Sequence, residues 1–93
     1  MKDNRLRTLW QQDRPAVNAW LSLRDSFAAE LMAHQGFDAL TVDLQHGLAD
    51  THTLLPLLQA IAATPAVPVV RVPWLEPGII MKSLDAGAYA VIC

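Results

Sequence analysis

The chain has 93 residues, of which 53% are hydrophobic and 17% are charged, and its formal net charge at pH 7 is only −2. This length suits one small domain. The apolar content argues against an intrinsically disordered chain, and the small net charge argues against a general affinity for nucleic acid. We therefore expect a globular protein whose partners are not nucleic acids.

The single cysteine, Cys93, has no second cysteine for an internal disulfide or for a cysteine-based metal site. This predicts a reducing compartment, with the cytoplasm as the default. The charged start of the chain is not followed by the apolar core of a secretory signal. No stretch approaches the roughly 20 apolar residues that cross a bilayer. We expect a soluble protein that does not bind membranes.

Hydrophobic periodicity and turn residues predict alternating helices and strands. The expected helices and strands alternate after an initial helix, with helices at residues 4–12, 26–35, 54–63 and 77–85 and strands at residues 16–22, 39–44, 67–72 and 89–93. Asn4 is a suitable N-cap for the first helix.

Capping residues set the other helix ends. Ser26 is the expected N-cap of the second helix, and Gly36 is its left-handed C-terminal stop. Thr53 is the expected N-cap of the third helix, because Pro56 then takes the third helical position, where its missing N–H has no intrahelical partner. Pro77 suits the first position of the last helix.

The strand at residues 39–44 has two different faces. Its even positions are large and apolar and its odd positions are small or polar, with Leu40, Val42 and Leu44 set against Ala39, Thr41 and Asp43. In a parallel barrel the outer face packs on helices, so the odd positions are expected to point to the barrel axis.

Strands that alternate with helices of about ten residues predict βα units and a parallel sheet. The four glycines are isolated, so the chain has neither a dinucleotide-binding fingerprint nor a P-loop. This favours an α/β fold of the (β/α)₈ TIM-barrel type. A complete barrel has about 250 residues. We therefore expect a single partial domain of about three and a half βα units, with a helical segment at 1–14 and the first half of a barrel at 15–93, ending within strand four.

Polar residues stand where the predicted strands end, the edge at which α/β enzymes gather reactive groups. Trp20, Asp43, His46 and Arg71 all meet this condition. Arg71 keeps its charge at any working pH and needs an anion, either a buried carboxylate such as Asp43 or a substrate. His46 is either a solvated loop residue or a catalytic one. Asp85 stands in the last turn of a helix, where the dipole disfavours it; judged by the residues alone, it is a solvated aspartate near a turn.

Three segments resemble a known family. They are GFDALTVDLQHG at residues 36–47, VVRVPW at 69–74 and LDAGA at 84–88. Together they are similar to the class II pyruvate aldolases typified by 4-hydroxy-2-oxoheptanedioate aldolase and, more distantly, to the citrate lyase β-subunit and malyl-CoA lyase group. The resemblance covers about residues 15 to 93, and the fold it implies is the (β/α)₈ barrel.

The resemblance implies a carbon–carbon lyase that reversibly cleaves a 4-hydroxy-2-oxo acid into pyruvate, or a related 2-oxo acid, and an aldehyde. By position, His46 is similar to the general acid/base of the family and Asp85 to the carboxylate that orients it. Arg71 is similar to the cation at the pyruvate oxygens, and Trp20 to the aromatic residue beside the substrate. Asp43 is expected to support Arg71 or His46.

The same resemblance implies a divalent metal such as Mg²⁺, Mn²⁺ or Co²⁺, and no Schiff-base lysine. The expected metal ligands lie beyond Cys93, so the chain alone is expected to be inactive. Gln45 replaces the Glu that many members carry before the motif histidine, a difference that affects the local network. The family often forms hexamers, which predicts a homo-oligomer.

Two alternatives from other classes remain open. One is a small doubly wound ligand-binding or receiver-like module, complete at this length, in which Asp43 and Asp85 gather at strand ends. The other is a non-catalytic fragment that serves only in assembly. Sequential strand order supports the barrel, whereas an order reversed around strand one supports the open sheet. For the barrel fragment, we expect an exposed fourth strand and an uncovered inward face of the sheet.

Overall fold

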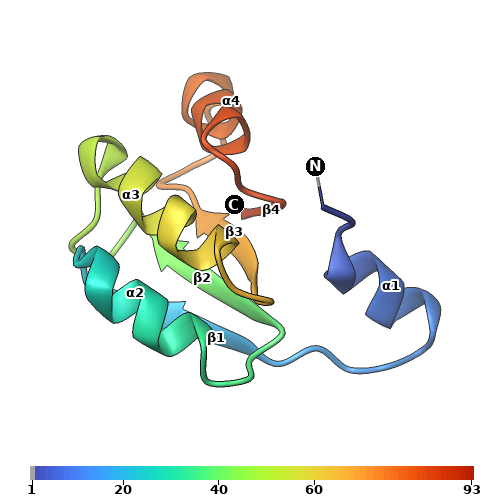
Figure 1. Ribbon diagram of the computed structural model, residues 1–93. Helices are drawn as coiled ribbons and strands as arrows, with labels where there is room; N and C mark the ends of the chain where they lie inside the picture. Colours follow the sequence, from blue (N-terminus) through green and yellow to red (C-terminus); the bar gives the residue numbers. More distant parts are fainter. Residues whose placement is uncertain (1) are drawn as a thin grey trace.

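The computed structural model describes residues 2–93 and contains four helices and four strands (Figure 1). In chain order they are α1 (Arg5–Gln11), β1 (Asn18–Leu21), α2 (Ser26–Ala33), β2 (Ala39–Asp43), α3 (Thr51–Ala62), β3 (Val67–Arg71), α4 (Pro77–Asp85) and β4 (Ala90–Ile92). All neighbouring strands are parallel, and the sheet order is β1-β2-β3-β4. This sequential order confirms the predicted barrel arrangement and contradicts the doubly wound, receiver-like alternative.

One face of the sheet carries the main hydrophobic core. Leu40 and Val42 of β2 are fully buried, and so is Val70 of β3. They pack with α2 and α3, which lie together on one side of the sheet in Figure 1. The predicted outward orientation of Leu40 and Val42 is confirmed, because side chains alternate between the two faces of a strand.

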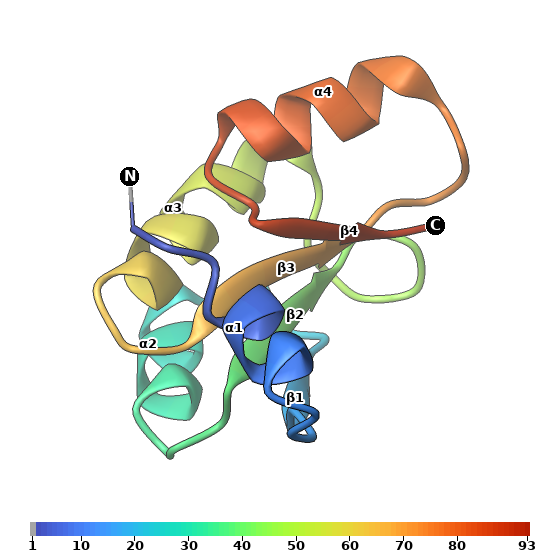
Figure 2. The ribbon, with the colours of Figure 1, turned by 90° about the vertical axis from the view of Figure 1, so that its right-hand side faces the viewer.

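The opposite face is partly covered by α1. Leu6 of this helix is 5% exposed and packs against Ala39, Val67 and Val69, all on the inward face. Figure 2 shows α1 in front of the sheet, with α2 and α3 behind it. The expectation of an uncovered inward face is therefore wrong for its amino-terminal part. Sequence periodicity identified the amphipathic helix but not the surface it covers.

Helix α3 begins earlier than predicted, at Thr51 instead of Leu54. Asp50 is the N-cap. Its carboxylate accepts a hydrogen bond from the backbone N–H of Thr53, and the Thr53 hydroxyl accepts one from the backbone N–H of Asp50, which makes a capping box. Pro56 consequently lies inside the helix and cannot donate to the carbonyl of His52. Both residues are exposed, so water can satisfy that carbonyl, and the capping box offsets the lost bond.

Helix α2 shows a similar one-residue difference. Asp25, not Ser26, is the N-cap, and its carboxylate accepts from the backbone N–H of Phe27 at 3.0 Å. Asp and Ser cap helices about equally well, so sequence alone does not choose between adjacent candidates. Two other predicted helix starts are confirmed: Asn4 caps α1, and Pro77 is the first residue of α4.

The whole segment is as compact as an ordinary domain of its size. Its radius of gyration is 12.2 Å, and about 12 Å is expected for this length. β4 is less buried than β3. Its last residue, Ile92, is exposed, as predicted for an edge strand. No helix within residues 2–93 is both long enough and apolar enough to cross a membrane.

Candidate active site at the carboxyl edge of the sheet

Three polar side chains meet where β1, β2 and β3 end. Asp43 and Arg71 are direct neighbours across β2 and β3, and Trp20 of β1 is paired with Thr41, two residues before Asp43. Because side chains alternate along a strand, Trp20, Asp43 and Arg71 all point to the inward face. The structure therefore brings together three of the residues predicted from sequence.

Asp43 and Arg71 form a two-point ion pair. Arg71 Nε donates to Asp43 Oδ1 at 3.0 Å, and Arg71 Nη2 donates to Asp43 Oδ2 at 2.6 Å. The Asp43 side chain is 3% exposed and the Arg71 side chain is 25% exposed. Such parallel pairs fix the plane of the guanidinium as well as its position. Two of its five N–H donors are used, and the other three donate to no residue between 2 and 93.

Trp20 contacts both members of this pair. Its indole Nε1 donates to Asp43 Oδ2 at 3.1 Å, and the guanidinium carbon of Arg71 lies 4.9 Å from the centroid of its ring. This distance is within the range of a cation–π interaction. Sequence reasoning placed Trp20 beside a substrate and missed its contact with Arg71, because that contact depends on how three strands are aligned.

Asp43 also fixes the loop that carries His46. Its Oδ1 accepts from the backbone N–H of Gln45 at 2.9 Å and from that of His46 at 3.1 Å. The Gln45 side chain donates to the carbonyl of Pro73 at 3.0 Å and joins this loop to the loop after β3. This link across two loops was also missed, since no local pattern reports it.

The Asp43 carboxylate accepts five N–H bonds in all. The hydrogen bonds from Arg71 are the largest cause that holds the pKa of Asp43 far below its ordinary value. Burial by itself would raise this pKa, and the bonds from His46, Trp20 and Gln45 lower it further. Asp43 in turn raises the pKa of Arg71. A carboxylate has about four lone-pair positions. Asp43 is therefore ionised and fully occupied, which suits a structural centre and not a proton acceptor.

Gly47 allows the loop after β2 to fold against the ends of the strands. A Cβ at this position would collide with the backbone carbonyl of Asp43 and would lie 3.3 Å from Ser22 Cα. The next residue, Leu48, donates its backbone N–H to the carbonyl of Ser22 at 2.8 Å. Glycine at position 47 thus sets the path of the His46 loop.

His46 lies at the same edge as Arg71, since its backbone N–H and Arg71 Nε bond to the same oxygen of Asp43. Its side chain is exposed. Asp85 lies elsewhere: it is the last residue of α4, which runs back from the carboxyl edge toward the amino end of β4 (Figure 2). Nine helical residues span about 13 Å. The predicted pairing of Asp85 with His46 is therefore not formed within the chain.

The residues between 2 and 93 do not bring together three or more His, Cys, Asp or Glu side chains that could hold a metal ion. Asp43, the acid nearest the candidate site, has its lone pairs occupied by N–H groups. The donor set of the described chain therefore does not fit a divalent metal.

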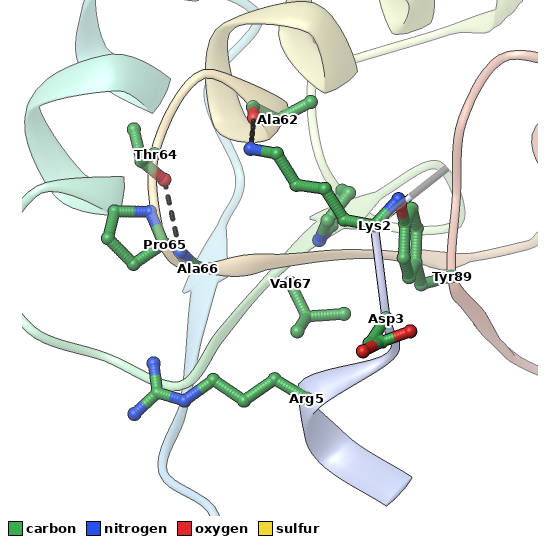
Figure 3. A pocket seen from close by; sticks show the side chains of 10 residues that line it. Lys2, Asp3, Arg5, Ala62, Thr64, Pro65, Ala66, Val67 and Tyr89 are labelled. Atoms are coloured by element: carbon green, nitrogen blue, oxygen red, sulfur yellow. Dashed lines mark hydrogen bonds between the residues drawn. The ribbon is translucent and has the colours of Figure 1, made fainter. Parts of the chain in front are cut away.

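A cavity of about 520 Å³ lies at the other edge of the sheet, near the start of β3 (Figure 3). Its two cationic side chains have structural partners: Lys2 Nζ donates to the carbonyl of Ala62 at 2.8 Å, and Arg5 pairs with Asp38 at 2.7 Å. In parallel α/β barrels this edge supports stability, and reactions occur at the carboxyl edge. We therefore locate the candidate site at Arg71 and not in this cavity.

Sequential parallel strands, helices on the outer face and polar groups at the carboxyl edge define the class of (β/α)₈-barrel enzymes. A family model described as HpcH/HpaI aldolase/citrate lyase matches residues 17–93. The chain belongs to this family, and its fold is that of the N-terminal part of the barrel.

The similar proteins include two curated aldolases. A hydroxypyruvate/pyruvate aldolase of Rhizorhabdus wittichii is 43% identical over 89 residues, which cover 96% of this chain and 36% of that protein. A 4-hydroxy-2-oxo-heptane-1,7-dioate aldolase of Salmonella dublin is 40% identical and is covered to 34%. The chain thus spans about a third of the length of the curated relatives it matches.

Solved structures agree with this assignment. A crystal structure of an aldolase/citrate lyase family protein from Burkholderia cenocepacia superposes with a TM-score of 0.87 at 41% identity, over 96% of this chain and 36% of that one. Macrophomate synthase gives a TM-score of 0.77 at 19% identity, over 95% of this chain and 30% of that one, and shows the likeness of the fold alone.

Proposed function

We propose that this chain carries the anion-binding and acid/base residues of an aldolase that reversibly cleaves a 4-hydroxy-2-oxo acid into pyruvate, or a related 2-oxo acid, and an aldehyde. The observation that carries the proposal is that the His46 loop and the Arg71 guanidinium are held by one oxygen of Asp43 at the carboxyl edge of the sheet. The names of the curated relatives, which are aldolases of 2-oxo acids, support it.

The proposed reaction gives each residue a distinct task. Cleavage of the C3–C4 bond leaves its electron pair on C3, from where it is delocalised onto the C2 oxygen as an enolate. The unoccupied N–H donors of Arg71 stabilise that developing negative charge, as fixed donors do in oxyanion holes. The imidazole of His46 accepts the C4 hydroxyl proton, directly or through one water. The C4 carbon then leaves as the aldehyde, and a proton, from the His46 imidazolium or from water, is added to C3 of the enolate to give pyruvate.

The pairing of Arg71 with Asp43 shapes this role. Because the carboxylate balances the charge, Arg71 offers a ligand oriented N–H groups more than a net positive charge. Extra charge to hold a 2-oxo acid would come from the divalent metal that we inferred from resemblance. Its ligands would lie outside residues 2–93.

Two expectations take a different form in this proposal. Within one chain Asp85 does not reach His46, so His46 acts without it unless a second copy supplies an acid. The homo-oligomer, with a hexamer as the expected form, remains a prediction, as does the cytoplasmic location.

The decisive test places this chain within a protein of the length of its curated relatives. In a chimera, this chain replaces the matching 89 residues of the Rhizorhabdus wittichii aldolase, and pyruvate release from 4-hydroxy-2-oxo acids is assayed with and without a chelator. We expect activity that chelator abolishes. Arg71→Ala and His46→Ala should each lower kcat/KM by about 100-fold or more.

The matched control is Arg5→Ala, which removes an arginine from an ion pair at the opposite edge of the sheet. It should leave kcat/KM within about twofold of the parent chimera. A chimera with native circular dichroism that releases no pyruvate, or one that keeps full activity without Arg71 and His46, would exclude the proposed function.

A second candidate is favoured by one observation. Arg71 already has an internal anion, Asp43, with which it pairs at two points, as a purely structural ion pair would in the non-catalytic assembly alternative. In that case Arg71→Ala would lower kcat/KM of the chimera only as far as it lowers the folded fraction. A loss of turnover in fully folded protein separates the two functions.

A further inference from the structure

We propose that Trp20 is a positioning residue that holds the guanidinium of Arg71 in one orientation, so that its free Nη1–Nη2 edge is presented to the ligand. This inference rests on the proposed function for its consequence in catalysis, but its structural part can be tested separately. It assigns Trp20 a role through Arg71, in addition to the place beside the substrate predicted from sequence.

Trp20 contacts the Asp43–Arg71 ion pair at two points. Its Nε1 donates to Asp43 Oδ2, the same oxygen that accepts from Arg71 Nη2. Its ring lies 4.9 Å from the guanidinium carbon. One side chain on β1 therefore restrains both partners, which are on β2 and β3.

The contacts with Asp43 leave part of the Arg71 guanidinium free to bind a ligand. Asp43 occupies the edge of the guanidinium formed by Nε and Nη2, and the guanidinium carbon lies over the indole ring. A planar guanidinium donates only within its plane. Of the three remaining N–H groups, one on Nη1 and one on Nη2 share the second edge of the guanidinium, and the other on Nη1 points to the Cδ side.

An indole is the side chain that can make both contacts of Trp20. A phenyl ring would keep the cation–π contact but lose the indole N–H, and an aliphatic side chain would lose both. Trp20 is 41% exposed, so the surrounding core does not depend on its volume. Its two polar contacts explain an indole here better than packing does.

The structural part is tested on this chain by nuclear magnetic resonance of the Arg71 Nε–H group. Trp20→Leu should make its exchange with solvent about tenfold faster and abolish its ring-current shift. Trp20→Phe should keep the ring-current shift and show intermediate exchange. Trp74→Leu is the matched control, because Trp74 is a 71% exposed tryptophan on the loop after β3, and it should change neither quantity.

Amide spectra of Leu40 and Val70 report whether each variant keeps its core. If Trp20→Leu does not fold, the comparison of Trp20→Phe with the native chain decides by the exchange rate alone. Unchanged exchange and chemical shift of Arg71 in the folded Trp20 variants, or equal changes in Trp74→Leu, would overturn the proposal.

The catalytic part is tested in the chimera by a double-mutant cycle. If Trp20 acts through Arg71, Trp20→Leu should lower kcat/KM about tenfold in the presence of Arg71 and have almost no effect in the Arg71→Ala background. If the two losses multiply, Trp20 acts on the substrate by itself and the positioning role is wrong. An inactive chimera would count against the proposed function, whereas the resonance experiment would still decide whether Trp20 orients Arg71.

Discussion

The two edges of the sheet each contain one arginine–aspartate pair, and the pairs differ in what surrounds them. At the amino edge, Arg5 and Asp38 are 2.7 Å apart, with side chains 45% and 16% exposed. At the carboxyl edge, Arg71 and Asp43 are 2.6 Å apart and are 25% and 3% exposed. The amino-edge pair fastens α1 to the loop before β2, whereas the carboxyl-edge pair is the centre of a network that includes the His46 loop.

The surroundings of the two ion pairs, more than the pairs themselves, indicate their functions. Asp38 accepts one further bond, from the backbone N–H of Val17 at 2.8 Å. Asp43 accepts three bonds besides those from Arg71, two of which shape a loop. A desolvated carboxylate with many donors is costly to remove and holds its partners rigidly. Rigid donors at the carboxyl edge are what the proposed reaction requires.

The largest expected effect comes from removing the two carboxylates in turn. Asp43→Ala should lower the free energy of unfolding by about 3 kcal/mol, the lower end of the range for a buried pair, because the Arg71 guanidinium that it leaves unpaired is only partly buried. Asp38→Ala should cost about 1 kcal/mol or less, because its pair is more exposed. Urea unfolding followed by circular dichroism measures both. Equal losses would show that the two edges do not differ as proposed.

A smaller effect is expected for two glycines at the two edges. Gly47→Ala should cost about 1 to 3 kcal/mol, because the new methyl group meets the Asp43 backbone. Gly36→Ala, at the C-terminal end of α2, should cost about 1 to 2 kcal/mol through its positive φ of 95° alone.

The two glycine variants should differ more in their effect on kcat/KM than in their effect on stability. In the chimera, Gly47→Ala should reduce kcat/KM through displacement of His46, and Gly36→Ala should leave the kcat/KM of the folded protein unchanged. Full activity of Gly47→Ala would contradict the proposed function of the His46 loop.

The smallest expected effect is on the pH dependence of stability. Because the pKa of Asp43 is lower in the folded chain than its ordinary value of 3.8, its contribution is fully present well above pH 3.8 and is lost as the pH falls toward the folded-state pKa. At pH 3 the native chain should have lost about 1 kcal/mol of this contribution.

The control for the pH prediction is Asp43→Asn, which cannot titrate. Asp50 and Glu76 also have lowered pKa values, owing to bonds from backbone N–H groups, and titrate in both proteins. The difference between the native and variant curves therefore isolates Asp43. Parallel curves between pH 6 and pH 3 would contradict a lowered pKa at this position.

Local patterns predicted most of the elements of the fold. The alternation of large and small residues in β2 correctly assigned Leu40 and Val42 to the helix-covered face, since side-chain direction in a strand follows from sequence position. Helix starts were less predictable. Asp50 caps α3 three residues before the predicted site, because a strong capping box outweighs the cost of Pro56 in an exposed turn.

The amino-acid sequence alone predicts that Trp20, Asp43 and Arg71 stand at the carboxyl ends of three parallel strands, because hydrophobic alternation and strand direction are local properties. The folded sheet was needed to show that Asp43 and Arg71 are register partners. It was also needed to show that Trp20 contacts both of them and that Asp85, at the end of α4, lies away from His46. These contacts depend on strand register and helix direction, and a shift of one residue in register would turn the same side chains to the other face.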